Sequence, residues 1–254
     1  EAKAQELWHL IEPFAAYGFN KAHAASYGKV AYQTAYMKAN FPAEYMTAVL
    51  TAESGDVEEV ARIIEECKRM QIPVLPPDVN ESVGDFTVLK KKTDTREART
   101  EGSTREARDE IRFGLYTIKN LGKEIADAII TERNANGPFT TYANFLDRIK
   151  HKNLNKKSLE ALIKAGAMDT RGERGQMLFN LDDALAYNRE GMKEASQGSL
   201  FGLLEDQNSV PTLTLKPSAP APLLDKLAWE KELLGLYISG HPLEQFKEKF
   251  AKNE

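Results

Sequence analysis

The feature that most limits how this chain can fold is a tight turn between two amphipathic segments in residues 113–139. Residues 118–122 form the turn, and the segment after it carries apolar side chains at helical spacing. Gly137 and Pro138 end that second segment. We expect Gly122 to adopt a backbone φ that a side chain would resist. The pattern predicts two short helices joined by a tight turn.

Two lysines flank this turn. Lys119 and Lys123 lie beside Asn120 and Gly122, where the second helix is expected to begin. The first N–H groups of a helix have no partner within the helix, and phosphate oxygens accept hydrogen bonds from them. We therefore expect these four residues to contact a DNA backbone without reading bases. An ordinary helical hairpin whose glycine only closes the loop explains the same stretch equally well.

A second, weaker copy of the pattern follows downstream. A short amphipathic helix over residues 140–149 leads through a basic turn to another helix, which Gly166 can end. Residues 142–175 carry eight Lys or Arg against four Asp or Glu, whereas the whole chain has a net charge of −4. Lys152 and Lys156 are the candidate phosphate contacts of this copy. The repetition favours a nucleic-acid contact over an isolated hairpin.

Composition excludes several other classes of protein. The 254 residues, 42% of them hydrophobic and 28% charged, are typical of a globular chain with one large or two small domains. A pI near 5.8 argues against binding nucleic acid over the whole surface, so such a contact must come from local patches. Cys67 is the single cysteine, which excludes internal disulfides and CxxC zinc sites and fits a reducing cytoplasm.

Neither a membrane segment nor a metal site is expected. No apolar run approaches the roughly 18 residues of a membrane span. The four histidines, at positions 9, 23, 151 and 241, show no spacing typical of metal ligands. The chain has no initiator Met and begins within an expected helix, so we expect it to be a piece of a larger protein.

The N-terminal third is expected to be helical. Asn20 is a plausible N-cap, and Lys21 and His23 follow it in the first turn, where both can share a surface with the helix N-terminus. This surface is a candidate contact for a nucleotide triphosphate; a solvated face with an ordinary cap is the simpler interpretation. Asp56 and Glu59 form an expected capping box for a later scaffold helix.

Two short strands are expected on either side of a polar insertion. Prolines make residues 72–80 extended and stiff. Residues 85–89 and 110–115 alternate with period two and should pair as a small antiparallel hairpin. Between them, residues 90–109 contain the pentapeptide TREAR twice, which is typical of a solvated insertion.

An apolar island interrupts a polar linker. One helix is expected over residues 171–187, and the chain from residue 191 to 224 is loop-like and rich in Pro, Ser and Thr. Exposure of Leu200 and Phe201 in this linker would cost about 1.5–3 kcal/mol each, so we expect them to dock in a pocket of a partner, oriented by Gln197. Packing back onto their own domain is the alternative.

The C-terminal stretch is expected to be mostly helical. A helix that buries Leu227, Leu233 and Leu234 is followed by a short strand that ends at Gly240. A last amphipathic helix closes the chain.

A series of short segments places the chain beside a known family. They are FNKAHAASY, YQTAYMKANFPAEYM, LPPDVN, FGLYTIKNLG, LNKKSLEALIKAGAMD, QGSLF and LLGLYISGHPL. In these segments and in their order, the chain resembles the alpha subunit of bacterial replicative DNA polymerase III over nearly its whole length. The TREAR insertion departs from the family pattern.

The resemblance implies a mainly α fold with a small antiparallel β hairpin. The implied regions are the C-terminal part of the fingers (1–83), the β hairpin (84–117), a tandem helix-hairpin-helix DNA-binding region (113–188), a flexible linker (189–224) with a clamp-binding peptide (197–201), and terminal helices that start the connection to an OB domain (225–254).

The resemblance also implies partners and site residues. The implied contacts are with the incoming nucleotide at Lys21 and His23, with duplex primer-template DNA at the first turn, and with the sliding clamp at Gln197, Leu200 and Phe201. Other replicase subunits are implied partners as well. In this family the aspartates that hold two Mg²⁺ ions lie in the palm, which has no counterpart here. We therefore expect no catalytic residue and no cofactor in this chain, and no activity from it alone.

Two other classes of protein share parts of the pattern. A helix-hairpin-helix DNA glycosylase needs a catalytic Asp after a Gly-Pro loop, but Phe139 and Thr140 follow that loop here. Asp147 lies among basic residues with no partner that its spacing would indicate. A non-enzymatic scaffold that uses the hairpins for protein contacts is the second alternative, and weak DNA binding insensitive to salt would favour it.

Overall fold

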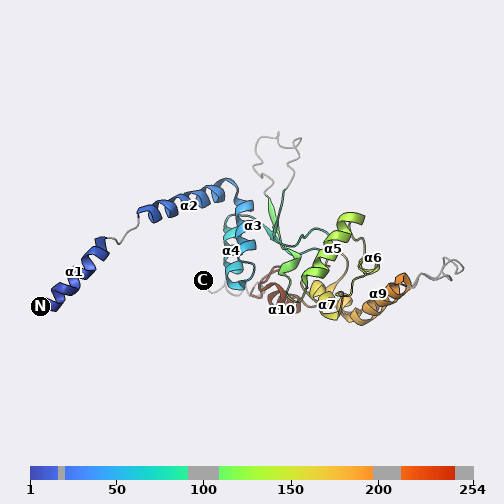
Figure 1. Cartoon of the computed structure of the whole chain (residues 1–254). Helices are drawn as coiled ribbons and strands as arrows, with labels where there is room; N and C mark the ends of the chain where they lie inside the picture. Colours follow the sequence, from blue (N-terminus) through green and yellow to red (C-terminus); the bar gives the residue numbers. More distant parts are fainter. Residues whose placement is uncertain (17–20, 91–108, 197–212, 244–254) are drawn as a thin grey trace, which may run out of the picture. The chain divides into compact units, whose positions relative to one another are not determined.

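A computed structural model describes residues 1–16, 21–90, 109–196 and 213–243. Within these ranges the chain is mainly α, with ten α-helices, one 3-10 helix and one three-stranded sheet, which confirms the expected fold class (Figure 1). It divides into two compact units, Glu1–Met46 and Thr47–Glu254.

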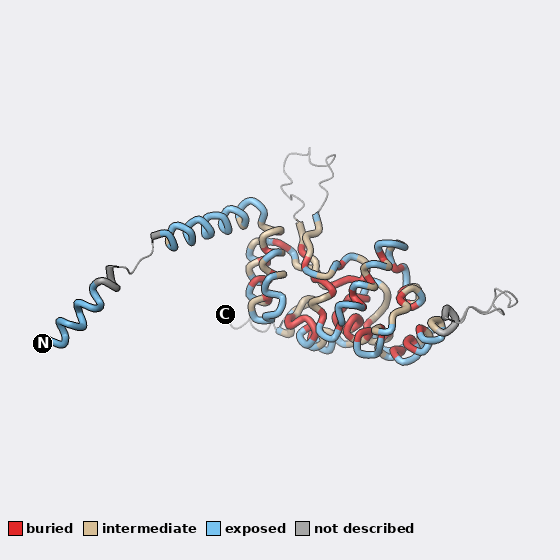
Figure 2. Tube along the Cα trace, viewed as in Figure 1, coloured by how far each residue is buried: buried red, intermediate tan, exposed pale blue. Residues whose placement is uncertain are grey.

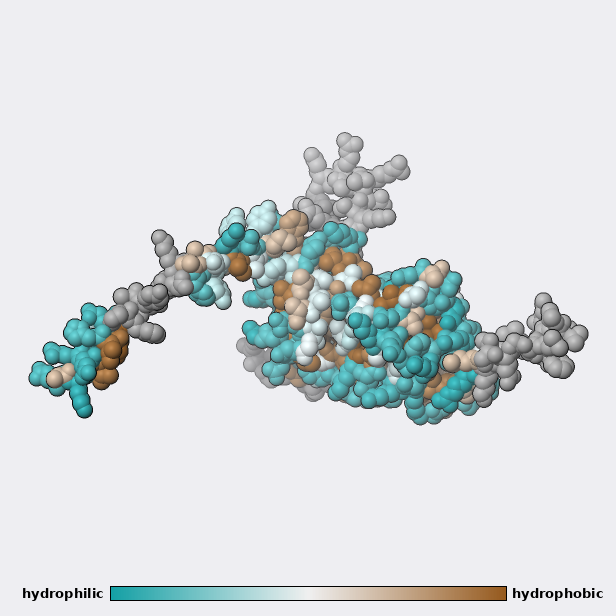
Figure 3. Space-filling view, viewed as in Figure 1, coloured by the Kyte–Doolittle hydropathy of each residue, from teal (hydrophilic) through white to brown (hydrophobic). Residues whose placement is uncertain are grey.

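The first unit consists of helices with little core of their own. It contains α1 (Ala2–Ala16), α2 (Lys21–Asn40) and the start of α3 (Pro42–Ala52), which begins at its proline as expected. Nearly every described residue of α1 and α2 is exposed (Figure 2). Apolar side chains gather on the surface of α1, where Trp8 is 64% exposed (Figure 3).

After the rest of α3, the second unit continues with a capped scaffold helix, α4 (Val57–Arg69). Asp56 accepts hydrogen bonds from two N–H groups of the first turn, as expected for an N-cap. The reciprocal half of the expected capping box is replaced, because the Asp56 N–H donates to the Glu53 carbonyl and the Glu59 carboxylate pairs with Arg62. The buried face of α4 comprises Val60, Ile63, Ile64 and Cys67.

The sheet has one strand more than the expected hairpin. Strands β2 (Thr87–Leu89) and β3 (Glu110–Arg112) pair in antiparallel fashion, as predicted. The prediction missed β1 (Val74–Leu75), which pairs in parallel with the other edge of β3 and makes the order β1-β3-β2. Pro73 has no N–H, but its carbonyl accepts the Ile111 N–H at 2.9 Å, so the proline suits the end of an edge strand.

The polar insertion is not described, and two segments that were expected to be strands are not strands. Residues 91–108, which hold both copies of TREAR, lie outside the described residues. Leu115 does not extend β3 as expected but begins a 3-10 helix, η1 (Leu115–Thr117). The expected C-terminal strand before Gly240 is also wrong, because the described residues after α10 (Leu223–Leu234) contain no strand.

Five helices complete the second unit around a common core (Figure 2). They are α5 (Lys123–Asn136), α6 (Tyr142–Arg148), α7 (Lys156–Lys164), α8 (Arg174–Phe179) and α9 (Leu181–Ser196). Gly137 and Gly166 follow α5 and α7 with φ values of 80° and 83°, so both glycines end their helices as predicted. The single helix expected over 171–187 is in fact two, and the second runs on to Ser196.

The break between α8 and α9 anchors the far end of the linker. Asn180 interrupts the helix and uses its amide to donate to the Lys216 carbonyl and to accept the Lys216 N–H at 2.8 Å. Farther on, the Ala221 N–H donates to Glu173, whose carboxylate also pairs with Lys226. The described end of the expected flexible linker is therefore fastened along α8.

A buried arginine joins α8 to α10. Arg174 donates to Asp169, to Glu230 and to the Lys164 carbonyl. Gly166 leaves room for this guanidinium, since a Cβ there would lie 2.4 Å from its terminal nitrogen. A charged group, together with apolar packing, therefore sets the position of α10.

Candidate nucleic-acid interface

The backbone of the first turn differs from the sequence prediction in one respect. The Leu121 N–H donates to the Ile118 carbonyl at 3.1 Å and closes the turn. The left-handed residue is Asn120, with φ of 70°, whereas Gly122 has φ of −68°. The expectation for Gly122 is therefore wrong, because asparagine is one of the few residues that tolerate this region and takes the strained position itself.

Gly122 instead affects the start of α5. It occupies the N-cap position and supplies no side-chain hydrogen bond. A Cβ at this residue would meet nothing within 4 Å, so the position is open to solvent or ligand. The first N–H groups of α5 therefore keep their capacity to bind an anion.

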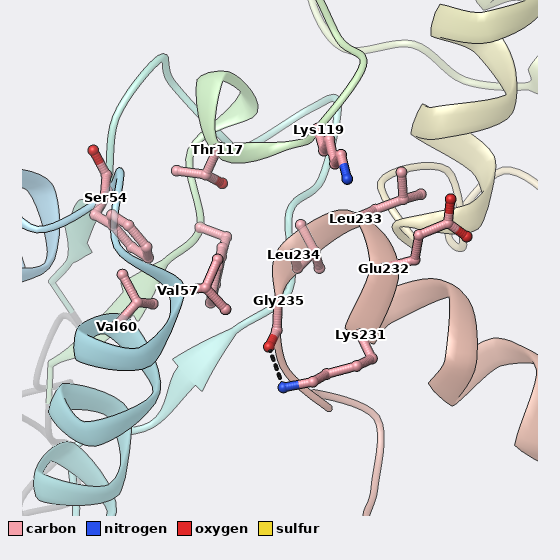
Figure 4. Close-up of a pocket in the computed structure, with 12 residues that line it drawn as sticks. Ser54, Val57, Val60, Thr117, Lys119, Lys231, Glu232, Leu233, Leu234 and Gly235 are labelled. Carbon is pink, nitrogen blue, oxygen red and sulfur yellow. Dashed lines mark hydrogen bonds between the residues drawn. The ribbon is translucent and has the colours of Figure 1, made fainter.

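The two lysines of the first turn make different contacts. The Lys119 N–H donates to the Leu233 carbonyl at 3.0 Å, and its side chain lines a cavity of about 310 Å³ beside the end of α10 (Figure 4). Lys123 instead places its ammonium 4.9 Å from the centre of the Tyr116 ring, at the first turn of α5. Both lysines and Asn120 are exposed, but only Lys123 belongs to the helix whose N-terminus is uncapped.

The second turn is capped by its own side chains. Asn155 accepts the Ser158 N–H, and the Ser158 hydroxyl accepts the Asn155 N–H, which completes a capping box at the start of α7. Lys156 is exposed and pairs with Asp182 at 2.9 Å. Lys152 is exposed too, and no carboxylate in the described part of the chain forms an ion pair with it. Lys152 is therefore the stronger phosphate candidate of the second copy.

A side-chain bond brings the two turns together. The amide of Asn153, in the second turn, donates to the carboxylate of Glu124, in the first turn of α5, at 2.5 Å. Neither residue was expected at the site, because neither has a local sequence signal for a contact 29 residues away. The two hairpin turns therefore lie side by side.

The surface between the turns is not uniformly basic. A cavity of about 390 Å³ between α5 and the second turn is lined by both signs of charge, including Glu124, Asp127 and Lys150. Arg148 lines the cavity as well. It donates a hydrogen bond to Glu132, and this bond lowers the pKa of Glu132 below its usual value. The positive excess found in the sequence is thus partly neutralised by carboxylates from outside that stretch, which pair with Arg148, Lys156 and Arg174.

The other candidate residues are placed less fully. Lys21 is the first residue of α2, although its side chain lies outside the described set. The exposed His23 ring packs 4.3 Å from the Tyr27 ring, centre to centre. Gln197, Leu200 and Phe201 lie outside the described residues.

Within the described ranges, no group of three or more His, Cys, Asp or Glu side chains could hold a metal ion. In the same ranges, no helix is long and apolar enough to cross a membrane.

Comparison with known proteins identifies relatives along almost the entire chain. A family model described as a helix-hairpin-helix motif matches residues 71–177, which include both turns. DNA polymerase III subunit alpha from Deinococcus radiodurans is 43% identical over 96% of this chain, that from Thermus aquaticus 40% over 96%, and that from Campylobacter jejuni 38% over 98%. The chain spans only 17%, 18% and 20% of the length of these relatives. The chain is therefore homologous, along nearly its whole length, to one segment of the DNA polymerase III alpha subunits.

Proposed function

We propose that this chain is the segment of a replicative DNA polymerase that binds the backbone of duplex primer-template DNA through its two hairpin turns. The observation that carries the proposal is the uncapped N-terminus of α5 beside the exposed Lys123. The bond between Asn153 and Glu124 supports it, because it sets a second basic turn next to the first.

The geometry favours contact with phosphate over contact with bases. Backbone N–H groups at the start of α5 and the ammonium of Lys123 are donors without shape selectivity for a base edge. Lys152 adds a second positive charge, whereas the capped start of α7 offers fewer free N–H groups. We therefore expect weak, sequence-independent binding that depends strongly on salt.

The wider role in the proposal follows from the homology. The polymerase activity would belong to the longer protein, with Mg²⁺ held by carboxylates of a palm outside this chain. Lys21 and His23 would face the incoming nucleotide. Gln197, Leu200 and Phe201 would bind the sliding clamp, and other replicase subunits would complete the assembly.

The homology and the charge pattern separate this proposal from its alternatives. Identities of 38–43% to polymerase subunits over nearly the whole chain favour a polymerase segment over a DNA glycosylase. A protein-binding scaffold would show DNA affinity that is weak and insensitive to salt.

The test is a salt titration of duplex DNA binding by the full 254-residue chain. Each lost phosphate contact should reduce the slope of log K against log salt by about 0.9. Lys123→Ala should therefore reduce the slope by about 0.9, the value for one phosphate contact. The further replacement Lys119→Ala should reduce it by up to about 0.9 more. Lys68→Ala, in an exposed ion pair on α4, is the matched control and should leave the slope unchanged. An unchanged slope in the double variant would contradict the proposal.

Gly122 offers a second arm that tests the helix N-terminus itself. Gly122→Asp introduces a capping carboxylate in open space, which should hold the first N–H groups and repel phosphate while the helix stays folded. Gly122→Ala adds a Cβ in the same space without a cap, and we expect near wild-type DNA binding. Equal DNA affinity of the Asp and Ala variants would show that the start of α5 does not bind phosphate.

A further inference from the structure

The ring of Tyr116 lies between a glycine and the key lysine of the first turn. On one side, a Cβ built on Gly84 would come within 2.2–2.8 Å of three ring atoms, so the ring rests directly on the Gly84 backbone. On another, the Lys123 ammonium lies 4.9 Å from the ring centre, within the range of a cation–π contact. The ring therefore contacts both the sheet-side backbone and α5.

Backbone bonds fix the ring in this place. The Tyr116 N–H donates to the Gly84 carbonyl at 2.9 Å, and the Leu115 N–H donates to the Val83 carbonyl at 2.8 Å. Gly114 permits this approach, since a Cβ there would lie 2.2 Å from the Gly84 carbonyl oxygen. Two glycines thus let η1 lie on the chain that leads into β2.

The hydroxyl of Tyr116 contacts a carboxylate that lies one helical turn from Lys123. Lys123 and Asp127 are four residues apart on α5, a spacing at which opposite charges attract. The Tyr116 hydroxyl instead donates to Asp127, and this hydrogen bond raises the pKa of Tyr116. No ion pair between Lys123 and a carboxylate occurs in the described part of the chain.

We propose that Tyr116 is a positioning residue for DNA backbone binding: its ring holds the Lys123 ammonium beside the uncapped start of α5, and its hydroxyl keeps Asp127 from pairing with that ammonium. This inference rests on the proposed function, because it assigns Lys123 a phosphate. It gives Tyr116 a role that requires no contact between Tyr116 and DNA.

The experiment is a double-mutant cycle on duplex DNA binding by the full chain, measured across a salt series. Tyr116→Phe keeps the ring but frees Asp127 to pair with Lys123, and should weaken binding about three- to fivefold, the size of a charge-assisted surface contact. In an Asp127→Asn background, where no carboxylate competes, Tyr116→Phe should have no effect. Tyr116→Leu removes the ring as well, and its effect should vanish in a Lys123→Ala background.

The outcomes separate this inference from the proposed function. If Lys123→Ala and Lys119→Ala together leave the salt slope unchanged, the proposed function itself is wrong. If Lys123→Ala lowers the slope but Tyr116→Phe weakens binding equally with Asp127→Asn present or absent, the positioning role is overturned. Additive losses for Tyr116→Leu and Lys123→Ala would overturn it too. Circular dichroism melting of each variant identifies loss of folding, and Tyr116→Phe, which preserves ring volume, keeps the test valid if Tyr116→Leu unfolds.

Discussion

Replacement of Arg174 by Met should strongly destabilise the second unit. The side chain of Arg174 is 2% exposed and that of its partner Glu230 is 1% exposed, so neither charge has water to replace a lost partner. Arg174 also donates two hydrogen bonds to Asp169 and one to the Lys164 carbonyl. Arg174→Met removes all of these at once and leaves the Glu230 carboxylate without a counter-charge.

The magnitude follows from what each former partner can do afterwards. Loss of one member of a buried ion pair costs about 3–5 kcal/mol. Glu230 keeps hydrogen bonds from the N–H groups of Ile238 and Ser239, so the cost of leaving its carboxylate unpaired lies near the lower end of this range. The orphaned Lys164 carbonyl adds about 1 kcal/mol, whereas the Asp169 side chain is 45% exposed and can regain water. We expect a loss of about 4 kcal/mol in the free energy of unfolding.

The assay is urea unfolding followed by the fluorescence of Trp229, which lies next to Glu230 on α10, in a Trp8→Phe background. Glu230→Gln should cost less, about 1–2 kcal/mol, because Arg174 keeps both bonds to Asp169. Arg62→Met, which breaks an ion pair whose arginine is 77% exposed, is the control and should cost at most about 1 kcal/mol. A loss below about 1 kcal/mol for Arg174→Met would refute the reasoning.

Three further predictions concern a buried hydroxyl and the linker peptide. The Tyr142 hydroxyl is buried with no hydrogen-bond partner in the described part of the chain, so Tyr142→Phe should stabilise the protein by about 1 kcal/mol in urea unfolding; a clear loss would reveal a hidden partner. Burial raises the pKa of Tyr142 above its ordinary 10.0, so the free energy of unfolding should fall as pH rises above 10, and Tyr142→Phe should reduce that fall. The proposed clamp contact predicts that Leu200→Ala with Phe201→Ala abolishes binding to the sliding clamp in surface plasmon resonance, because burial of both side chains would contribute on the order of 3–5 kcal/mol, while the DNA salt slope stays unchanged. Clamp affinity equal to wild type would rule out this peptide as the anchor.

The sequence by itself determined features that a few neighbouring residues encode. Gly137 and Gly166 end their helices, Pro42 begins one, and Asp56 caps another, because backbone φ preferences and capping bonds act within about one turn. Local preferences did not predict the backbone conformation where two nearby residues had similar preferences. Asn120 and Gly122 both tolerate positive φ, and only the structure assigns it to Asn120.

Only the tertiary structure decided which distant segments meet. Strand β1 pairs with β3 across the polar insertion, Asn153 reaches Glu124, and Arg174 pairs with a glutamate 56 residues away. A two-residue strand, a half-buried asparagine and a charged side chain have no periodicity that indicates a partner. Their contacts arise because a folded core brings the partners within bonding distance and, around Arg174 and Glu230, also excludes water, which no stretch of sequence displays on its own.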